Sequence, residues 1–235
     1  MTRRRWIADE IHGNTAALTG EHASHLARVL RAQVGQEFDI ATGDGVRRGA
    51  ITSISEARVE FALGDEQLVQ PAADVTLVLA VFKFDRMEWA IEKCTEIGVT
   101  RIVPVIAQRT DSHLAGAAMK RRERWQRLVL QASEQSRRAA PPEVAVPVKL
   151  KQLAGPASGL RVVLAESGEK ARFRDVLASG SSPLVLAIGP EGGWTPEETR
   201  SFHDSGWKAA SLGDNILRAE TAAIVATALA LASLQ

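Results

Sequence analysis

The sequence predicts a small β domain over residues 1–70, followed by an α/β domain with a parallel sheet over residues 74–235. Short strands punctuated by glycine turns fill the first region, as in small barrels. From Val75 onward, apolar strands alternate with helical segments, which predicts a parallel sheet covered on both faces. A chain of 235 residues is long enough to form two modest hydrophobic cores.

In the first region we expect three strands: Glu37–Ala41, Arg48–Ile54 and Arg58–Leu63. Glycine-containing turns are expected to separate them, at Gly35, Gly43-Asp44-Gly45 and Gly64-Asp65. A helix of about Glu21–Arg31 interrupts the strands, and Pro71 marks Gln70–Asp74 as a linker.

The second region has five apolar runs that we expect to be strands: Val75–Phe82, Arg101–Ala107, Leu160–Ala165, Leu184–Ile188 and Ala209–Leu212. A continuous apolar run such as the first is typical of a strand buried on both faces. Helices are expected between them and at the end, at about Arg86–Ile97, 117–138 and Ala219–Leu234, and Gly98 is placed to end the first helix.

Composition narrows the class of protein. The single cysteine, Cys94, cannot form an internal disulfide, so we expect a reducing, cytoplasmic setting. The longest mostly apolar run, Ala222–Ala232, is too short to span a bilayer, and no signal peptide is evident. Because no apolar run is long enough to span a bilayer, we expect no membrane partner. The histidines have no metal-ligand spacing, so we also expect no metal.

Charge is unevenly distributed along the chain. The formal net charge is +1, but residues 101–151 carry 11 Lys/Arg against 4 Asp/Glu. A basic segment of this kind indicates either a positive face for a polyanion or an ordinary solvated helix surface.

Two segments point to a ligand pocket, and the first is Ile188–Trp194 (IGPEGGW), at the end of a buried strand. Glycine turns at this position bind ligands in open α/β folds, although a plain strand-to-helix turn has the same appearance. Thr195 and Pro196 open the next helix, and the acids Glu197 and Glu198 in its first turn would repel a phosphate. The cationic S-adenosylmethionine satisfies that constraint.

The second segment is Leu212–Ala222 (LGDNILRAETA), which also joins a strand to a helix. Its apolar residues Ile216 and Leu217 lie in a loop. They either sandwich a flat base or tuck into the core.

These segments belong to a longer series of matches: His25–Arg31 (HLARVLR), Lys83 with Asp85–Glu88, Lys93–Val99, Arg109-Thr110, Trp125, Ala132–Ser136 with Arg138, and the two segments above. In this order and over nearly the whole chain, they resemble the family of 16S ribosomal RNA uridine N3-methyltransferases in the SPOUT superfamily. Phe84, Asn215 and Arg137 depart from the family pattern, which often has Gly, Arg and Gly or Lys at these positions.

The resemblance implies a SPOUT α/β domain with a C-terminal trefoil knot, preceded by a PUA-like RNA-binding barrel. It also implies a homodimer that methylates N3 of a uridine in small-subunit 16S ribosomal RNA, with S-adenosylmethionine as cofactor. Two alternatives stay open: a SPOUT methyltransferase with a transfer RNA base or ribose as target, and a non-catalytic RNA-binding module.

Site residues follow from the resemblance in three groups. The cofactor group is Leu164, Ala165, Glu166, Ile188, Gly189, Glu191, Gly192, Gly193, Leu212, Gly213, Ile216, Leu217 and Thr221. The catalytic candidates are the arginines Arg218 and Arg138, suited to stabilising negative charge, and Glu134 and Glu220 as proton acceptors or as structural partners of arginine. The RNA-binding candidates are Arg5, Arg28, Arg31, Lys83, Arg109, Arg121 and Arg124.

Overall fold

The computed structural model describes residues 5–43, 45–69, 72–153, 159–165, 171–178 and 182–234. Their contacts divide the chain into two compact units. The first comprises Met1–Pro71 and Leu130–Pro141, and the second comprises Ala72–Val129 and Pro142–Gln235. The expected domain limits, 1–70 and 74–235, stay a prediction.

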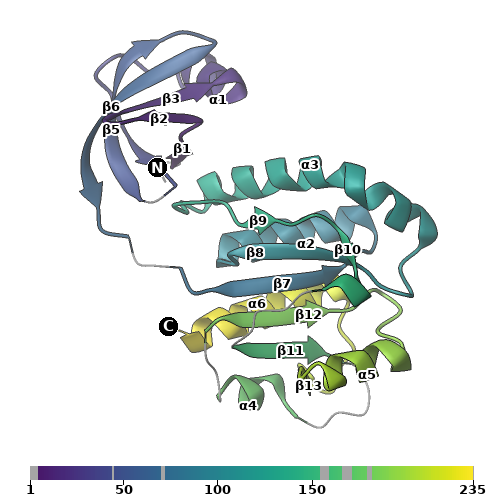
Figure 1. The fold of residues 1–235 in the computed structure, drawn as a ribbon. Coiled ribbons are helices and arrows are strands. Elements are labelled where there is room, and N and C mark those ends of the chain that lie inside the picture. Colours follow the sequence, from purple (N-terminus) through teal and green to yellow (C-terminus); the bar gives the residue numbers. More distant parts are fainter. Residues whose placement is uncertain are drawn as a thin grey trace. The chain divides into compact units, whose positions relative to one another are not determined.

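The first unit contains a six-stranded sheet, which is mostly antiparallel (Figure 1). Its strands are β1 (Trp6–Ile7), β2 (Glu10–His12), β3 (Thr15–Thr19), β4 (Glu37–Ala41), β5 (Val46–Ile54) and β6 (Arg58–Gln67), in the order β1-β4-β5-β6-β3-β2. Only β1 and β4 pair in parallel among these strands. The prediction of a small β domain is confirmed.

Alternating strand residues form the core of this unit. Leu18, Ile40, Val59 and Phe61 are fully buried, and Trp6 is nearly so. One inward face and one polar face are the pattern expected of antiparallel strands with one face on a core.

Two details of the first unit differ from the sequence prediction. β6 continues through Gly64-Asp65 to Gln67, because these two residues lie at an irregularity in the β5–β6 pairing opposite Arg48 and do not form a turn. The expected helix is split into α1 (Gly20–Ser24) and a π-helical turn (His25–Val29), and the chain leaves it through Arg31 at a φ of 50°. Asp44 of the expected turn lies outside the described residues.

The second unit is built on a parallel sheet of seven strands. They are β7 (Val75–Ala80), β8 (Arg101–Ile106), β9 (Glu143–Val144), β10 (Val148–Lys149), β11 (Leu160–Leu164), β12 (Leu184–Ile188) and β13 (Lys208–Ala210). The order is β10-β8-β7-β12-β11-β13, with β9 beside β8, and every pairing is parallel. The predicted parallel α/β class is therefore confirmed, and β12 is inserted between β7 and β11.

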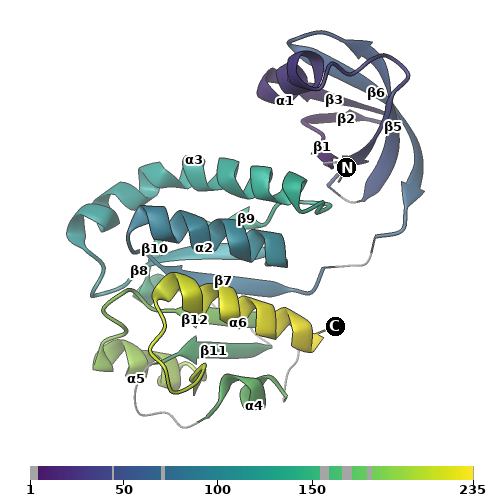
Figure 2. The same cartoon turned by 180° about the vertical axis from the view of Figure 1, so that it is seen from behind.

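Helices cover both faces of this sheet. On one face, α2 (Phe84–Ile97) packs against α6 (Ala219–Leu234), and α4 (Phe173–Leu177) lies in the same core cluster (Figure 2). On the other face, α5 (Pro196–Asp204) contributes Phe202 to a second cluster with Val78, Val185 and Trp207. The strands are buried on both sides, which explains their unbroken apolar runs.

The long basic helix, α3 (Ser112–Gln135), begins earlier and ends earlier than the predicted 117–138. Asp111 Oδ1 accepts the backbone N–H groups of His113 (2.8 Å) and Leu114 (3.4 Å), and this cap starts the helix. At the other end, Arg137 has a φ of 59°, which breaks the helical conformation. The strand expected at Ala209–Leu212 is observed at Lys208–Ala210. Within the described part of the chain, no helix is long and apolar enough to cross a membrane.

Close packing in the first unit makes a specific prediction at Gly49. A Cβ at this position would lie 2.6 Å from Ile40 Cγ1 and 3.2 Å from Phe61 Cβ, both in the core. Gly49→Ala should destabilise the protein by about 1–3 kcal/mol through overpacking. The matched change Gly116→Ala, at an exposed helix position with nothing within 4 Å, should stabilise it by about 0.5–1 kcal/mol. Calorimetric melting temperatures of both variants test this, and equal shifts would contradict it.

Candidate functional site

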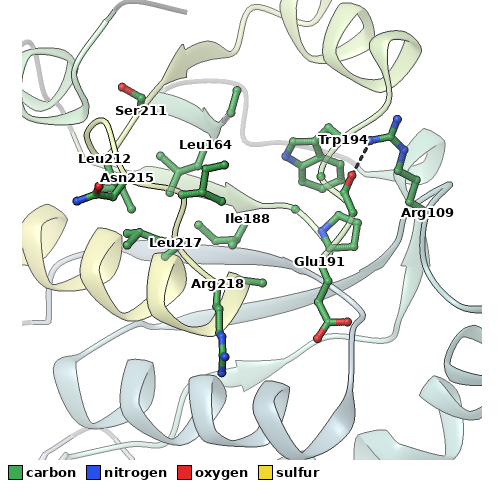
Figure 3. Close-up of a pocket in the computed structure, with 18 of the residues that line it drawn as sticks. Arg109, Leu164, Ile188, Glu191, Trp194, Ser211, Leu212, Asn215, Leu217 and Arg218 are labelled. Carbon is green, nitrogen blue, oxygen red and sulfur yellow. Dashed lines mark hydrogen bonds between the residues drawn. The ribbon is translucent and has the colours of Figure 1, made fainter. Parts of the chain in front are cut away.

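A pocket of about 520 Å³ lies at the carboxyl ends of five strands of the second unit. The loops that follow β7, β8, β11, β12 and β13 all contribute residues to it (Figure 3). Parallel strands place their carboxyl ends at one edge, where open α/β sheets bind ligands. The volume is within the range of about 300–1,000 Å³ that small-molecule sites have.

One wall of the pocket is apolar. Leu164 and Ile188 are the last residues of β11 and β12, Leu212 and Leu217 lie in the loop after β13, and all four gather on this wall (Figure 3). Ile216 also lines the pocket, and its side chain is 80% exposed. The structure thus excludes the reading in which Ile216 tucks into the core, because a core residue would be buried.

Glycine is required at several positions around the pocket. Gly193 has a φ of 69° and Gly213 a φ of 146°, which are strained for residues with a side chain. A Cβ at Gly189 would lie 3.2 Å from Trp194 Nε1, and one at Gly192 would lie 3.3 Å from Arg109 Cδ. Gly189 and Gly192 thus pack closely against Trp194 and Arg109, whereas a Cβ at Gly193 or Gly213 would meet nothing within 4 Å, which leaves the backbone there open to a ligand.

The second acid that follows the glycine loop, Glu198, accepts backbone N–H groups. Thr195 and Glu198 form a capping box, in which Thr195 Oγ1 accepts the N–H of Glu198 and Glu198 Oε2 accepts the N–H of Thr195 at 2.9 Å. Glu198 Oε1 accepts the N–H of Gln108 at 2.8 Å, and the residue is only 4% exposed. This buried carboxylate therefore joins the loop after β8 to the loop after β12.

Charged groups at the pocket are arranged around Arg86. Its Nη1 donates to Glu191 Oε1 at 3.0 Å, and its Nε lies 3.9 Å from Glu220 Oε1. Glu220 is 4% exposed, and its Oε2 has no hydrogen-bonding partner among the described residues. Arg218 is exposed and lines the pocket, and no carboxylate of the described part lies within ion-pair distance of it. Arg218 can therefore meet an added negative charge at this site.

Two catalytic candidates, Glu134 and Arg138, belong to the first unit. Glu134 is fully buried, with Oε1 3.5 Å from Nε2 of His22, whose Nδ1 is 3.5 Å from Asp9 Oδ2. Burial lowers the pKa of Arg138 to about 10, and its Nε donates to the carbonyl oxygen of Ala140 at 3.2 Å. The structure therefore does not bring the four catalytic candidates together within one unit.

The RNA-binding candidates are in varied surroundings. Arg5 Nη1 donates to the carbonyl oxygen of Arg137, and burial lowers the pKa of Arg5. Arg28 is paired with Glu56. Arg121 Nε and Arg124 Nε lie 2.6 Å and 2.9 Å from the carboxylate of Glu88, in α2. Arg31 and Lys83 are exposed.

All predicted cofactor residues within the described part line the pocket except Thr221. Glu166 lies outside the described residues. Lys83, Arg109 and Arg218, which were predicted for other roles, line the same pocket. Pro190, Trp194, Asp214, Asn215, Ala219 and Ala222 also line the pocket, and they lie within the predicted segments Ile188–Trp194 and Leu212–Ala222. Sequence reasoning missed Arg86, Thr199 and Ser211 as pocket residues. Ser211 directly precedes a predicted segment, whereas no local signal indicated Arg86 or Thr199.

No cluster of three or more His, Cys, Asp or Glu side chains suited to a metal ion occurs among the residues that the structure describes.

Comparison with known proteins identifies the class. A family model described as an RNA methyltransferase domain matches residues 69–231, and one described as an RNA methyltransferase PUA domain matches residues 18–63. Ribosomal RNA small subunit methyltransferase E of Synechocystis is 35% identical, over 97% of this chain and 77% of that protein. The Mycobacterium bovis protein of the same name is 33% identical, over 91% of this chain and 85% of that protein.

Solved structures agree. Ribosomal RNA small subunit methyltransferase E from Neisseria gonorrhoeae, bound to S-adenosyl methionine, superposes with a TM-score of 0.84 at 28% identity, covering 96% of this chain and 95% of that chain. A Legionella pneumophila protein in complex with the cofactor gives a TM-score of 0.85 at 28% identity, covering 99% and 98%. The molecule is thus an RNA methyltransferase with an N-terminal PUA domain. It belongs to the ribosomal RNA small subunit methyltransferase E family, whose cofactor is S-adenosylmethionine.

The residues at the pocket fit this cofactor. The apolar wall suits an adenine ring and a methylthio group, and the open glycine backbone suits polar atoms that need close approach. Glu191 also lines the pocket, where its carboxylate is paired with Arg86. The helix that follows the glycine loop, α5, has Glu197 and Glu198 in its first turn, which disfavours a phosphate there.

The buried carboxylate of Glu198 leads to a prediction about loop stability. In Glu198→Gln the side-chain NH2 must face one of two backbone N–H donors. This should lower the free energy of unfolding by about 1–3 kcal/mol. Glu197→Gln is the matched control, because Glu197 is exposed and accepts only the Gln108 side chain, at 3.2 Å. We expect the melting temperature without cofactor to fall for Glu198→Gln alone. Equal melting temperatures of the two variants would show that the hydrogen bonds of Glu198 do not contribute to stability.

Proposed function

We propose that this chain transfers the methyl group of S-adenosylmethionine to N3 of a uridine in 16S ribosomal RNA of the small subunit. The supporting observation is the pocket formed by 188–194 and 212–218 in a chain that belongs to this methyltransferase family. The sulfonium of the cofactor supplies an activated methyl group. The PUA-like domain and the basic residues named above would hold the RNA.

The protein must position the base and stabilise the negative charge that the base acquires when N3 loses its proton. N3 of uridine bears a proton and is a poor nucleophile until that proton leaves, after which negative charge spreads onto the base oxygens. Arg218 is suited to stabilise this charge, because it lines the pocket with a guanidinium that no acid of the described part neutralises. Holding the base in line with the methyl group provides much of the remaining rate enhancement.

For the acids, the structure favours different roles. Glu220 is buried beside Arg86 and is not among the residues that line the pocket, which supports a role in holding that arginine. Glu134 and Arg138 lie in the first unit, where Glu134 is buried and Arg138 Nε donates to the carbonyl oxygen of Ala140, so both have structural contacts there. The trefoil knot stays a prediction from the family resemblance.

A homodimer is part of the proposal, and α6 supports it. After Glu220 this helix has no charged residue as far as Leu234, and its residues Ala228, Leu229 and Ala232 are exposed. A helix that is apolar on all sides is normally buried. On α2, which packs against α6, Trp89 is 50% exposed. A second copy of the chain would cover this apolar surface.

The activity is tested with labelled S-adenosylmethionine and small-subunit ribosomal RNA from cells that lack the enzyme. We expect methyl incorporation, with 3-methyluridine found by mass spectrometry of nucleosides. Methylation found instead on a transfer RNA base or ribose would overturn the target. Binding of S-adenosylhomocysteine without incorporation into any RNA would overturn the activity.

The role of Arg218 is tested by Arg218→Ala. We expect methyl transfer to fall by about two to three orders of magnitude, as for loss of one group that stabilises developing charge. The melting temperature should stay unchanged, since the side chain is exposed. Wild-type turnover in this variant would remove Arg218 from the mechanism.

The dimer is tested by Leu229→Lys, which places a charge on the exposed apolar side of α6. We expect the wild-type protein to sediment as a dimer and the variant to shift toward monomer. Leu68→Lys is the control, because Leu68 is a fully exposed leucine in the first unit. A monomeric wild-type protein, or equal sedimentation of both variants, would contradict the dimer.

A further inference from the structure

The loop that connects β8 to α3, residues 107–111, is bonded to the first turn of α5, which follows the glycine loop after β12. Gln108 donates its backbone N–H to Glu198 Oε1 at 2.8 Å and its side-chain amide to Glu197 Oε2 at 3.2 Å. On its other side, Thr110 Oγ1 donates to the carbonyl oxygen of Val81, at the end of β7, at 3.1 Å. Hydrogen bonds therefore hold the β8–α3 loop on both sides of Arg109, and they fix the backbone from which its side chain extends.

Arg109 lies directly across the glycine loop. Its Nη1 donates to the carbonyl oxygen of Gly192 at 2.5 Å (Figure 3). Its aliphatic stem covers Gly192, since a Cβ on that residue would lie 3.3 Å from Arg109 Cδ and 3.6 Å from Arg109 Cβ. Gly192 has an ordinary backbone conformation, so close approach of Arg109 is the reason that glycine fits here.

The opposite side of the same loop is held by a second arginine. Arg86 Nη1 donates to Glu191 Oε1 at 3.0 Å. Residues 191 and 192 are consequently held by one arginine through a side chain and by another through a backbone carbonyl. Both arginines line the pocket.

We infer that Arg109 is a positioning residue that holds the backbone of Gly192 in the conformation that receives S-adenosylmethionine. The inference rests on the proposed function of this pocket. It differs from the sequence prediction, which gave Arg109 a contact with RNA. The Nη1 of this guanidinium already donates to the carbonyl oxygen of Gly192, which supports the positioning role.

Calorimetric binding of S-adenosylhomocysteine without RNA tests the inference. Loss of a charge-assisted hydrogen bond should weaken binding about tenfold in Arg109→Ala. Gly192→Ala should weaken it similarly, because its Cβ pushes Arg109 away. The double variant should be no weaker than the weaker single variant, since residues that act through one contact are not additive. Additive losses, or an unchanged affinity in Arg109→Ala, would overturn the inference.

A matched control and an RNA measurement separate the two roles. Arg200→Ala removes the same charge from an exposed position of α5 with no bond to either loop, and it should bind S-adenosylhomocysteine as the wild type does. In steady state, Arg109→Ala should raise KM for S-adenosylmethionine and leave KM for RNA unchanged. If Arg109→Ala instead reduces the salt dependence of RNA affinity by about one phosphate contact and keeps its cofactor affinity, Arg109 is an RNA contact and the inference fails.

The same titration distinguishes failure of the inference from failure of the proposed function. Wild-type protein that binds no S-adenosylhomocysteine would overturn both. Wild-type protein that binds it with the same affinity as Arg109→Ala would overturn only the positioning role.

Discussion

The site depends on the parallel pairing of β7 with β8 on one side and β12 on the other. Parallel strands end at the same edge, so connections far apart in the sequence meet there. Residues 188–194 follow β12, 211–217 follow β13 and 107–111 follow β8. Their loops carry many backbone polar groups that need hydrogen-bonding partners, and the loops supply partners to one another. The pocket is therefore a property of the sheet order as much as of any single motif.

The acids at the start of α5 illustrate how one residue can satisfy two constraints. In the sequence, Glu197 and Glu198 argue against a phosphate ligand, because negative charge at a helix N-terminus repels an anion. In the structure, the carboxylate of Glu198 also accepts two backbone N–H groups, from Thr195 and Gln108. Backbone N–H groups at a helix N-terminus can bind a phosphate in other proteins, but here those of Thr195 and Glu198 are bonded within the capping box. The α5 N-terminus therefore disfavours a phosphate for two reasons: its acids repel an anion, and Glu198 already occupies backbone N–H groups there.

Local charge is more balanced than the sequence count indicates. The segment 101–151 is strongly basic, yet Arg121 and Arg124 share the carboxylate of Glu88, which lies earlier in the chain. Arg121 also lies over the Phe84 ring at 5.1 Å. These arginines therefore stabilise the contact between α2 and α3, while keeping part of their surface exposed. A charge count along the sequence cannot detect such pairing, because the acid belongs to another element.

The sequence by itself determined the strand-and-helix alternation, the strand Leu184–Ile188, the final helix Ala219–Leu234 and the loops that line the pocket. Local periodicity, glycine turns and helix caps are sufficient for these, and the family resemblance added the cofactor. Only the tertiary structure decided which distant groups meet: Arg109 with Gly192, Arg86 with Glu191, and Glu198 with Gln108. It also assigned Glu134 and Arg138 to the first unit and Arg218 to the second. The physical reason is that strand order sets these pairings, and strand order is not encoded in the local spacing of residues.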